Sequence, residues 1–141
     1  RLVKELALYL KDIGINLLLE TGGESPITLR RLIEDADTKN IFVNLDTANL
    51  IMYGFGNPVD AVYTLHPYIK SMHIKDGMPP QNPKELGVET EFGEGFVDFP
   101  KVFKLLRKYG FSGPFIIERE ISDEKTANKI SDTLNKVKMF M

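Results

Sequence analysis

Runs of consecutive hydrophobic residues alternate with longer amphipathic stretches along most of the chain. Four runs have the length of buried strands, and they span residues 15–19, 41–45, 69–74 and 115–117. The stretches that follow them place hydrophobic residues three and four positions apart, which is the spacing of one helix face. Short strands that alternate with helices predict parallel βαβ units, in which crossover helices bury the sheet.

Capping residues mark where several helices begin. Residues 25–26 are Ser-Pro and residues 57–58 are Asn-Pro, and a capping side chain before a proline is typical of a helix N-terminus. Asp98 predicts a third start of this kind. Amphipathic patterns also predict a helix over residues 2–13, before the first strand, and another over residues 127–137, after the last one. A chain that opens within a helical pattern, without methionine, is expected to belong to a longer protein.

A long segment rich in glycine and proline, residues 77–97, separates the third strand from the helix that Asp98 begins. Connections in such folds usually have about 2–6 residues, so this one is several-fold longer. Pro79, Pro80 and Pro83 argue against a helix through its whole length. We predict a lid or binding loop at the carboxyl end of the third strand, mobile in the absence of ligand.

Composition narrows the class of protein. The 141 residues include 20 acidic and 18 basic side chains, and 43% are hydrophobic, which suits a single domain over residues 1–141. No run approaches the roughly 18 apolar residues of a membrane helix, and no secretory signal pattern is present. The absence of cysteine excludes disulfides and thiolate metal sites. Without a cluster of basic residues, nucleic-acid binding is not expected, and we expect a soluble, cytoplasmic protein.

Each of the four hydrophobic runs stops at a residue that can bind a metal ion. These residues are Glu20, Asp46, His73 and Glu118. Because parallel strands carry active sites at their carboxyl ends, the four side chains are expected to gather at one rim. The alternation of side chains along a strand also places them on the same, mixed face of the sheet, while the opposite face is apolar apart from Lys70.

A single carboxylate or histidine at the end of a strand is more often a helix cap or a structural residue. Four residues at equivalent positions of successive strands favour a shared site instead. Three carboxylates and one imidazole suit Mn²⁺, Mg²⁺ or Co²⁺ better than a metal that prefers thiolates. Lys75 lies two positions after His73, so the alternation places its side chain on the same face, near this site. Tyr53 and Phe55 could line a substrate pocket or only pack against neighbouring residues. His66 continues an apolar helix stripe and is predicted to lie outside the site.

Five segments of the chain resemble the sugar phosphate isomerase/epimerase family, the xylose isomerase-like TIM barrels. They are LLLETG at 17–22, NLDTANLIMYGFGNP at 44–58, IKSMHIKDG at 69–77, GEGFVDFPKVFKLL at 93–106 and GPFIIERE at 113–120. The resemblance covers nearly the whole chain but only the second half of the family's barrel. It implies an α/β fold, the parallel (βα)4 half that contains strands five to eight, preceded by one helix.

The resemblance also implies roles for particular residues. It implies a divalent metal ion held by the residues Glu20, Asp46, His73 and Glu118. The expected ion is Mn²⁺, with Mg²⁺, Co²⁺ or Zn²⁺ as alternatives. In the epimerase branch the two glutamates also move a proton to and from the substrate. Several branches carry a histidine three positions after the strand-six aspartate, whereas this chain has Asn49. The identity of the substrate therefore cannot be inferred from those branches. Asn49 and Lys75 are predicted to bind substrate.

The predicted activity is a metal-dependent isomerase or epimerase that acts on a sugar or sugar phosphate through an enediolate. A sugar dehydratase of the inosose type on the same scaffold is an alternative, and so is a non-catalytic half-barrel that serves as an interaction domain. An endonuclease of this superfold is disfavoured, because such a site needs several more histidines than the two in this chain. Whether the 141 residues are active alone stays open.

The chain is expected to contain only half of the strands of a closed barrel. A closed barrel of this type has eight strands and about 250 residues, while this chain supplies four strands. The first and last strands would then be unpaired edges, and one face of the sheet would be uncovered. Because exposed edges invite pairing with another chain, we expect self-association through these edges.

Overall fold

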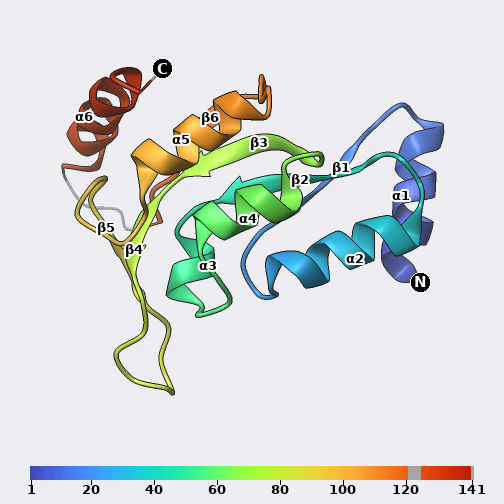
Figure 1. The fold of residues 1–141 in the computed structure, drawn as a ribbon, viewed down its shortest axis with the longest axis horizontal. Coiled ribbons are helices and arrows are strands. Elements are labelled where there is room, and N and C mark those ends of the chain that lie inside the picture. Colours follow the sequence, from blue (N-terminus) through green and yellow to red (C-terminus); the bar gives the residue numbers. More distant parts are fainter. Residues whose placement is uncertain (121–124, 141) are drawn as a thin grey trace.

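The computed structural model describes residues 1–120 and 125–140, and it confirms the predicted parallel sheet. Four strands lie in the order β1-β2-β3-β6, each parallel to its neighbour (Figure 1). Their bounds are β1 (Leu17–Glu20), β2 (Ile41–Asp46), β3 (Ile69–Ile74) and β6 (Phe115–Ile117). The spatial order follows the chain order, as in one half of a closed (βα)8 barrel.

Helices connect the strands in the predicted alternation. They are α1 (Leu2–Asp12), α2 (Pro26–Ala36), α4 (Pro58–Leu65), α5 (Phe99–Lys108) and α6 (Thr126–Lys138). The predicted caps are confirmed, since the side chains of Ser25, Asn57 and Asp98 each accept a hydrogen bond from a backbone N–H in the first turn of α2, α4 and α5. None of the helices described is long and apolar enough to cross a membrane.

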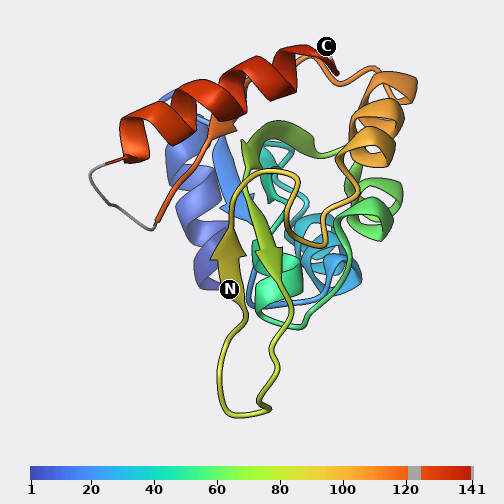
Figure 2. The ribbon, with the colours of Figure 1, turned by 90° about the vertical axis from the view of Figure 1, so that its left-hand side faces the viewer.

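One face of the sheet packs under the helices and the other is open. Val43, Leu45 and Met72 have no exposed surface and belong to the main hydrophobic core with the inner sides of α2, α4 and α5. On the opposite face Leu18 is 38% exposed and Ile116 is 45% exposed. The sheet curls around this open face, with the helices outside it (Figure 2).

The prediction from the alternation of side chains is wrong at the start of β3, where the register with β2 shifts. Val43 pairs with Ile69, but the next residue of β2, Asn44, pairs with Ser71, so Lys70 is an extra residue on β3. Ile69 therefore packs in the core, although alternation placed it on the mixed face. The Lys70 ammonium lies 5.1 Å from the centre of the Phe42 ring instead of on the helix-covered face. A bulge of this kind resets which face each side chain reaches.

Three short elements were absent from the sequence prediction. A single helical turn, α3 (Asn49–Met52), follows β2. The long segment after β3 contains a hairpin of β4 (Asp76–Met78) and β5 (Val88–Thr90), which pair antiparallel. The chain between β4 and β5 projects away from the body of the protein (Figures 1 and 2). The segment therefore lies at the carboxyl end of β3, as predicted, but as a projecting arm rather than an irregular loop.

One buried carboxylate, Asp76, anchors both ends of this arm. Its Oδ1 accepts hydrogen bonds from the N–H groups of Gly77 (2.9 Å) and Val97 (3.2 Å). Its Oδ2 accepts from Gly93 (2.9 Å) and Gly95 (3.0 Å). Gly93 has a φ of +87°, and a Cβ on Gly95 would lie 2.2 Å from Asp76 Oδ1. The turn predicted at 93–95 therefore needs both glycines to bring its amides to the carboxylate.

We expect Asp76→Asn to destabilise the fold by about 2–3 kcal/mol. The amide group cannot accept hydrogen bonds at both positions, so buried N–H donors lose a charged acceptor. Urea unfolding monitored by circular dichroism measures this. Glu94→Gln is the matched control, because it removes the same charge from an exposed position in the same turn and should change stability by less than about 0.5 kcal/mol. Equal stabilities of the two variants would contradict the anchoring role.

The 141-residue chain is expected to self-associate when it is expressed by itself. β1 and β6 each have one neighbouring strand in the four-stranded sheet, and the open face between them carries exposed apolar side chains. Unpaired strand edges of this kind recruit further strands. Sedimentation velocity at micromolar concentration tests the expectation, and Leu18→Lys, on the open face, should shift the equilibrium toward monomer. A stable monomer of the unaltered chain would show that the edges are tolerated.

Candidate metal centre

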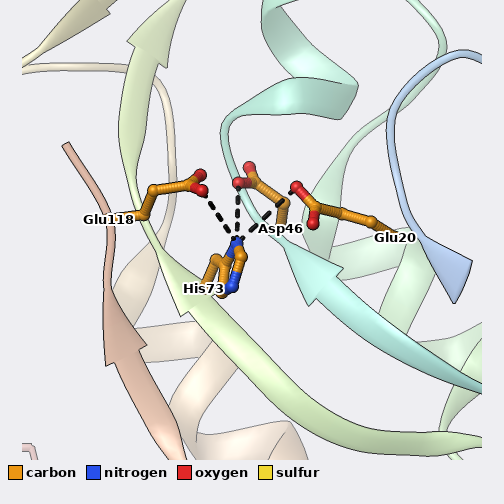
Figure 3. A group of neighbouring side chains, drawn as sticks. All are labelled: Glu20, Asp46, His73 and Glu118. Atoms are coloured by element: carbon orange, nitrogen blue, oxygen red, sulfur yellow. Dashed lines mark ion pairs between the residues drawn. The ribbon is translucent and has the colours of Figure 1, made fainter. Parts of the chain in front are cut away.

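The four residues predicted at the strand ends converge on one point of the rim (Figure 3). Glu20 and Asp46 end β1 and β2, His73 lies near the end of β3, and Glu118 follows β6 directly. His73 Nδ1 lies 3.6 Å from Glu20 Oε1, 3.7 Å from Asp46 Oδ2 and 3.4 Å from Glu118 Oε1. One ligand atom from each residue falls within 4.8 Å of the other three.

The geometry of these atoms fits a shared cation. The three distances from His73 Nδ1 exceed the roughly 2.7–3.2 Å of a hydrogen bond, and His73 Nδ1 and Asp46 Oδ2 are both buried without a hydrogen-bond partner. Ligand atoms that each lie about 2.1 Å from one ion are about 3.0–3.5 Å apart. Small side-chain rotations would bring all four atoms to such an ion. Two unpartnered buried atoms aimed at the same point are an observation that a simple polar cluster does not explain.

Asp46 is held in place by the backbone that follows it. Its Oδ1 accepts hydrogen bonds from the N–H groups of Ala48 (2.9 Å) and Asn49 (2.8 Å), where α3 begins. These bonds fix the carboxylate and leave Oδ2 facing His73. The side chain has no exposed surface. The short helix α3, which the sequence analysis missed, therefore positions a predicted ligand.

Two threonines tie neighbouring strand ends together. The Thr21 hydroxyl donates to the carbonyl of Asp46 (2.8 Å) and accepts from its N–H (2.9 Å). The Thr47 hydroxyl donates to the carbonyl of Lys75 (2.7 Å). Sequence reasoning missed both residues, although a signal was present, because a threonine directly follows Glu20 and again directly follows Asp46. Each of these threonines fixes one strand end against the next.

Glu20 receives two side-chain amides. Asn49 Nδ2 donates to its Oε1 (3.2 Å), and Asn44 Nδ2 donates to its Oε2 (3.3 Å). Asn49 also accepts a hydrogen bond from Lys75 Nζ (3.3 Å), so it connects the glutamate to the lysine. The glutamate side chain is 43% exposed. Glu20 is thus oriented by neutral donors and stays accessible from the open face.

Glu118 is instead paired with a buried cation. Lys75 Nζ donates to Glu118 Oε2 (3.1 Å) and to Glu120 Oε1, and it lies 3.9 Å from Asp46 Oδ2. The Lys75 side chain has no exposed surface, whereas that of Glu118 is 29% exposed. Lys75 therefore lies beside the predicted ligands, on the face that the alternation along the strand indicated, and its ammonium pairs with two carboxylates.

The charges of the site act on one another. Burial raises the pKa of Asp46 to about 8, with a smaller contribution from Glu118, although the backbone N–H of Asn49 and the charge of Lys75 oppose the shift. Burial also acts to raise the pKa of Glu118, but the hydrogen bonds from Lys75 and Asp46 and the charge of Lys75 together outweigh it and hold that pKa below its ordinary value. For Lys75 burial acts in the lowering direction, and the bond to Glu120 together with the charge of Asp46 raises its pKa above the ordinary value. The site without a metal ion therefore tends to keep one proton on Asp46.

The remaining predicted residues take different positions. The Tyr53 ring packs against Gly22 beside the site, while Phe55 is 47% exposed on the rim. His66 caps α4 and stacks on Tyr109 at 3.9 Å between ring centres, so its prediction as a packed residue outside the site is confirmed.

Comparison with known proteins places this geometry in context. The chain is 28% identical over 134 residues to an inosose dehydratase from Geobacillus thermodenitrificans (strain NG80-2), an alignment that covers 82% of this chain and 43% of that protein. It is 36% identical over 75 residues to a putative L-ribulose-5-phosphate 3-epimerase from Escherichia coli (strain K12), covering 52% and 26%. A xylose isomerase domain protein of known structure from Planctomyces limnophilus superimposes with a TM-score of 0.88 at 32% identity, covering 98% of this chain and 49% of that one.

The chain thus spans less than half the length of these relatives. The sequence model for the xylose isomerase-like TIM barrel matches residues 1–137, nearly all of the chain. Its relatives of known name are sugar epimerases and dehydratases. The chain belongs to the xylose isomerase-like TIM barrel family.

Proposed function

We propose that this chain provides the metal-binding half of an active site that isomerises or epimerises a sugar or sugar phosphate by proton transfer through an enediolate. The observation that carries the proposal is the convergence of three carboxylate oxygens on His73 Nδ1, together with the unpartnered Oδ2 of Asp46. In this proposal Glu20, Asp46, His73 and Glu118 hold one divalent cation.

The donor atoms indicate which cations fit. Three carboxylates and one imidazole form an oxygen-rich set with a net charge of three negative units, which suits Mn²⁺ first and also Mg²⁺, Co²⁺ or Zn²⁺. A divalent cation bound there supplies a Lewis acid that stabilises negative charge developing on the oxygen atoms of a sugar. It also supplies the counter-charge that the buried Asp46 carboxylate lacks.

Glu20 and Glu118 are the residues placed to move a proton. They lie on either side of His73, and both keep exposed surface toward the open face, in contrast to Asp46. Glu20 is oriented by the neutral amides of Asn44 and Asn49, whereas the carboxylate of Glu118 is paired with the Lys75 ammonium. We assign Glu20 as the base that removes the proton beside the carbonyl and Glu118 as its partner on the other side. Lys75 and Asn49 orient these carboxylates.

A sugar dehydratase is the second candidate, and the similarity to an inosose dehydratase favours it. Both reactions begin with removal of a proton next to a carbonyl, and they differ in whether a hydroxyl group is then expelled. Incubation of the metal-loaded protein with ketoses in D₂O separates them. An isomerase or epimerase incorporates deuterium at the reacting carbon without loss of water, whereas a dehydratase yields a product that is lighter by one water molecule.

A non-catalytic half-barrel is the third possibility, and metal binding tests it. Mn²⁺ is expected to raise the midpoint of thermal unfolding of the chain by several degrees, since a ligand that binds only the folded state stabilises it. His73→Ala should abolish this rise. His66→Ala is the matched control, because it removes the other histidine of the chain, which stacks on Tyr109 outside the site, and it should retain the rise. If His73→Ala keeps the rise, as His66→Ala is expected to, the proposed ligand set is contradicted.

The affinity for Mn²⁺ should depend on pH in a way that reports Asp46. Its raised pKa of about 8 means that the carboxylate must release a proton before it can bind the cation. The affinity is therefore expected to fall by about tenfold per pH unit below pH 8 and to level off above it. Isothermal titration calorimetry in buffers of different ionisation enthalpy measures both the affinity and the released proton. If the site held only carboxylates of ordinary pKa and an ordinary histidine, the affinity would already level off near pH 7. A plateau that begins near pH 7 would therefore contradict the raised pKa of Asp46.

A further inference from the structure

A buried arginine directly follows Glu118 and takes no part in the proposed proton transfer. The guanidinium of Arg119 contacts three consecutive residues in and after β5, at the base of the arm. It pairs with Glu89 (3.0 Å) and Glu91 (3.1 Å) and donates a hydrogen bond to the carbonyl of Thr90 (2.8 Å). Because a guanidinium presents its donors in a rigid plane, these contacts together fix the position of Arg119 against the arm.

The carboxylate of Glu89 holds the next residue of the chain as well. Its Oε2 accepts a hydrogen bond from the backbone N–H of Glu120 (3.0 Å), while its Oε1 pairs with Arg119. On the other side of Glu118, the N–H of Glu118 itself donates to the carbonyl of Ile74 at the end of β3 (3.2 Å). The backbone that carries Glu118 is therefore attached to β3 before this residue and to the arm after it.

Arg119 occupies the position that a threonine occupies after two of the other predicted ligands. Thr21 follows Glu20 and Thr47 follows Asp46, and each hydroxyl binds backbone groups at the next strand end. Within the part of the chain that the structure describes, β6 has β3 as its one neighbour in the sheet. The end of β6 thus has no following strand to bind, and the longer side chain of arginine binds the arm instead.

Burial distinguishes these contacts from an ordinary surface ion pair, which contributes little to stability. The side chains of Arg119 and Glu89 are 8% and 2% exposed. In the surface pair of Arg30 with Glu34 on α2 they are 37% and 47% exposed. Removal of one partner from a buried pair leaves an uncompensated charge in a place that water does not reach. The native position of Arg119 is therefore strongly specified.

We propose that Arg119 is a positioning residue of the metal centre, which holds Glu118 in place and thereby sets the affinity for the divalent cation. The inference rests on the proposed function, in which Glu118 is a metal ligand. Glu118 Oε1 lies 3.4 Å from His73 Nδ1 (Figure 3), and Lys75 donates to Oε2. With its carboxylate restrained by Lys75 and its backbone by Arg119, Glu118 loses little freedom when the cation binds. Removal of residues that support a ligand in this way typically changes metal affinity about 10–100-fold.

Arg119→Lys tests this role through the binding of Mn²⁺. Lysine keeps the positive charge, but its single ammonium group cannot reach all three acceptors in the geometry of a guanidinium. Isothermal titration calorimetry on the 141-residue chain is expected to show a Kd for Mn²⁺ that is raised about tenfold. Arg30→Lys is the matched control, because it makes the same change in an exposed ion pair on α2, and it should leave the Kd unchanged. Equal affinities of the two variants would overturn the proposal.

A milder pair of variants decides the question if Arg119→Lys fails to fold. Glu91→Gln removes one of the two carboxylates that pair with Arg119 and should raise the Kd by a few-fold. Lys129→Gln removes another ion-pair partner of Glu91, on α6 (3.1 Å), and keeps the acceptors of Arg119. It should leave the Kd unchanged. An equal loss of affinity in both variants would assign the effect to the contact between the arm and α6, and would contradict the role of Arg119.

Hydrogen exchange reads the order of the chain around Glu118 without a metal ion. In the metal-free protein Arg119→Lys should speed the exchange of the Glu118 and Glu120 amides several-fold. The amide of Asp46, which is bonded to Thr21, should keep its rate, whereas a general loss of stability would speed the exchange of all three. Unchanged exchange at Glu118, or an equal acceleration at Asp46, would overturn the inference.

The proposed function and the positioning role fail in different ways. If the unaltered chain does not bind Mn²⁺, the proposed metal centre is contradicted, and hydrogen exchange still decides whether Arg119 orders Glu118. If the unaltered chain and Arg119→Lys bind Mn²⁺ with the same affinity, the metal centre stands and only the positioning role is contradicted.

Discussion

The rim of this sheet depends on one buried carboxylate. Asp46 has no exposed surface, and it can remain charged there only if its environment compensates the loss of water. One of its oxygens receives two backbone N–H groups, and the other faces His73 with no hydrogen-bond donor. Burial alone moves the equilibrium toward the protonated form. A divalent cation bound here would favour the charged carboxylate over the protonated form. The carboxylate that burial destabilises in the free protein is therefore the one whose charge a bound cation would stabilise most.

The neighbours of Asp46 keep its geometry fixed. Thr21 and Thr47 bind backbone groups across adjacent strand ends, and neither of them uses its hydroxyl on a ligand atom. Lys75 lies behind the carboxylates and balances part of their charge. Because these contacts come from three consecutive βα units, the ligand positions are set by the parallel sheet itself and not by a flexible loop. Such preorganisation lowers the cost of assembling a charged site.

The sequence was sufficient to predict the strands, the helices with side-chain caps and the four convergent residues, because each depends on local patterns that repeat in every βα unit. It was insufficient where tertiary contacts decide. The bulge beside Lys70 exchanges the faces of Ile69 and Lys70, and alternation along one strand carries no information about the register with its neighbour. The hairpin of β4 and β5 is held by Asp76 through amides about twenty positions away, a distance over which no periodic pattern operates.

Hydrogen bonds and ion pairs connect the arm to the candidate metal centre. Asp76 fixes both of its ends, and Glu89 on β5 accepts a hydrogen bond from the backbone N–H of Glu120 (3.0 Å) and pairs with Arg119. Both of these residues directly follow Glu118, so the base of the arm determines the path of the chain that presents this glutamate. A lid that closed by moving the whole segment 77–97 would have to break these buried contacts. Closure over a substrate is therefore compatible only with bending between β4 and β5, where residues 81–86 are exposed, while the base of the arm stays in place as part of the site.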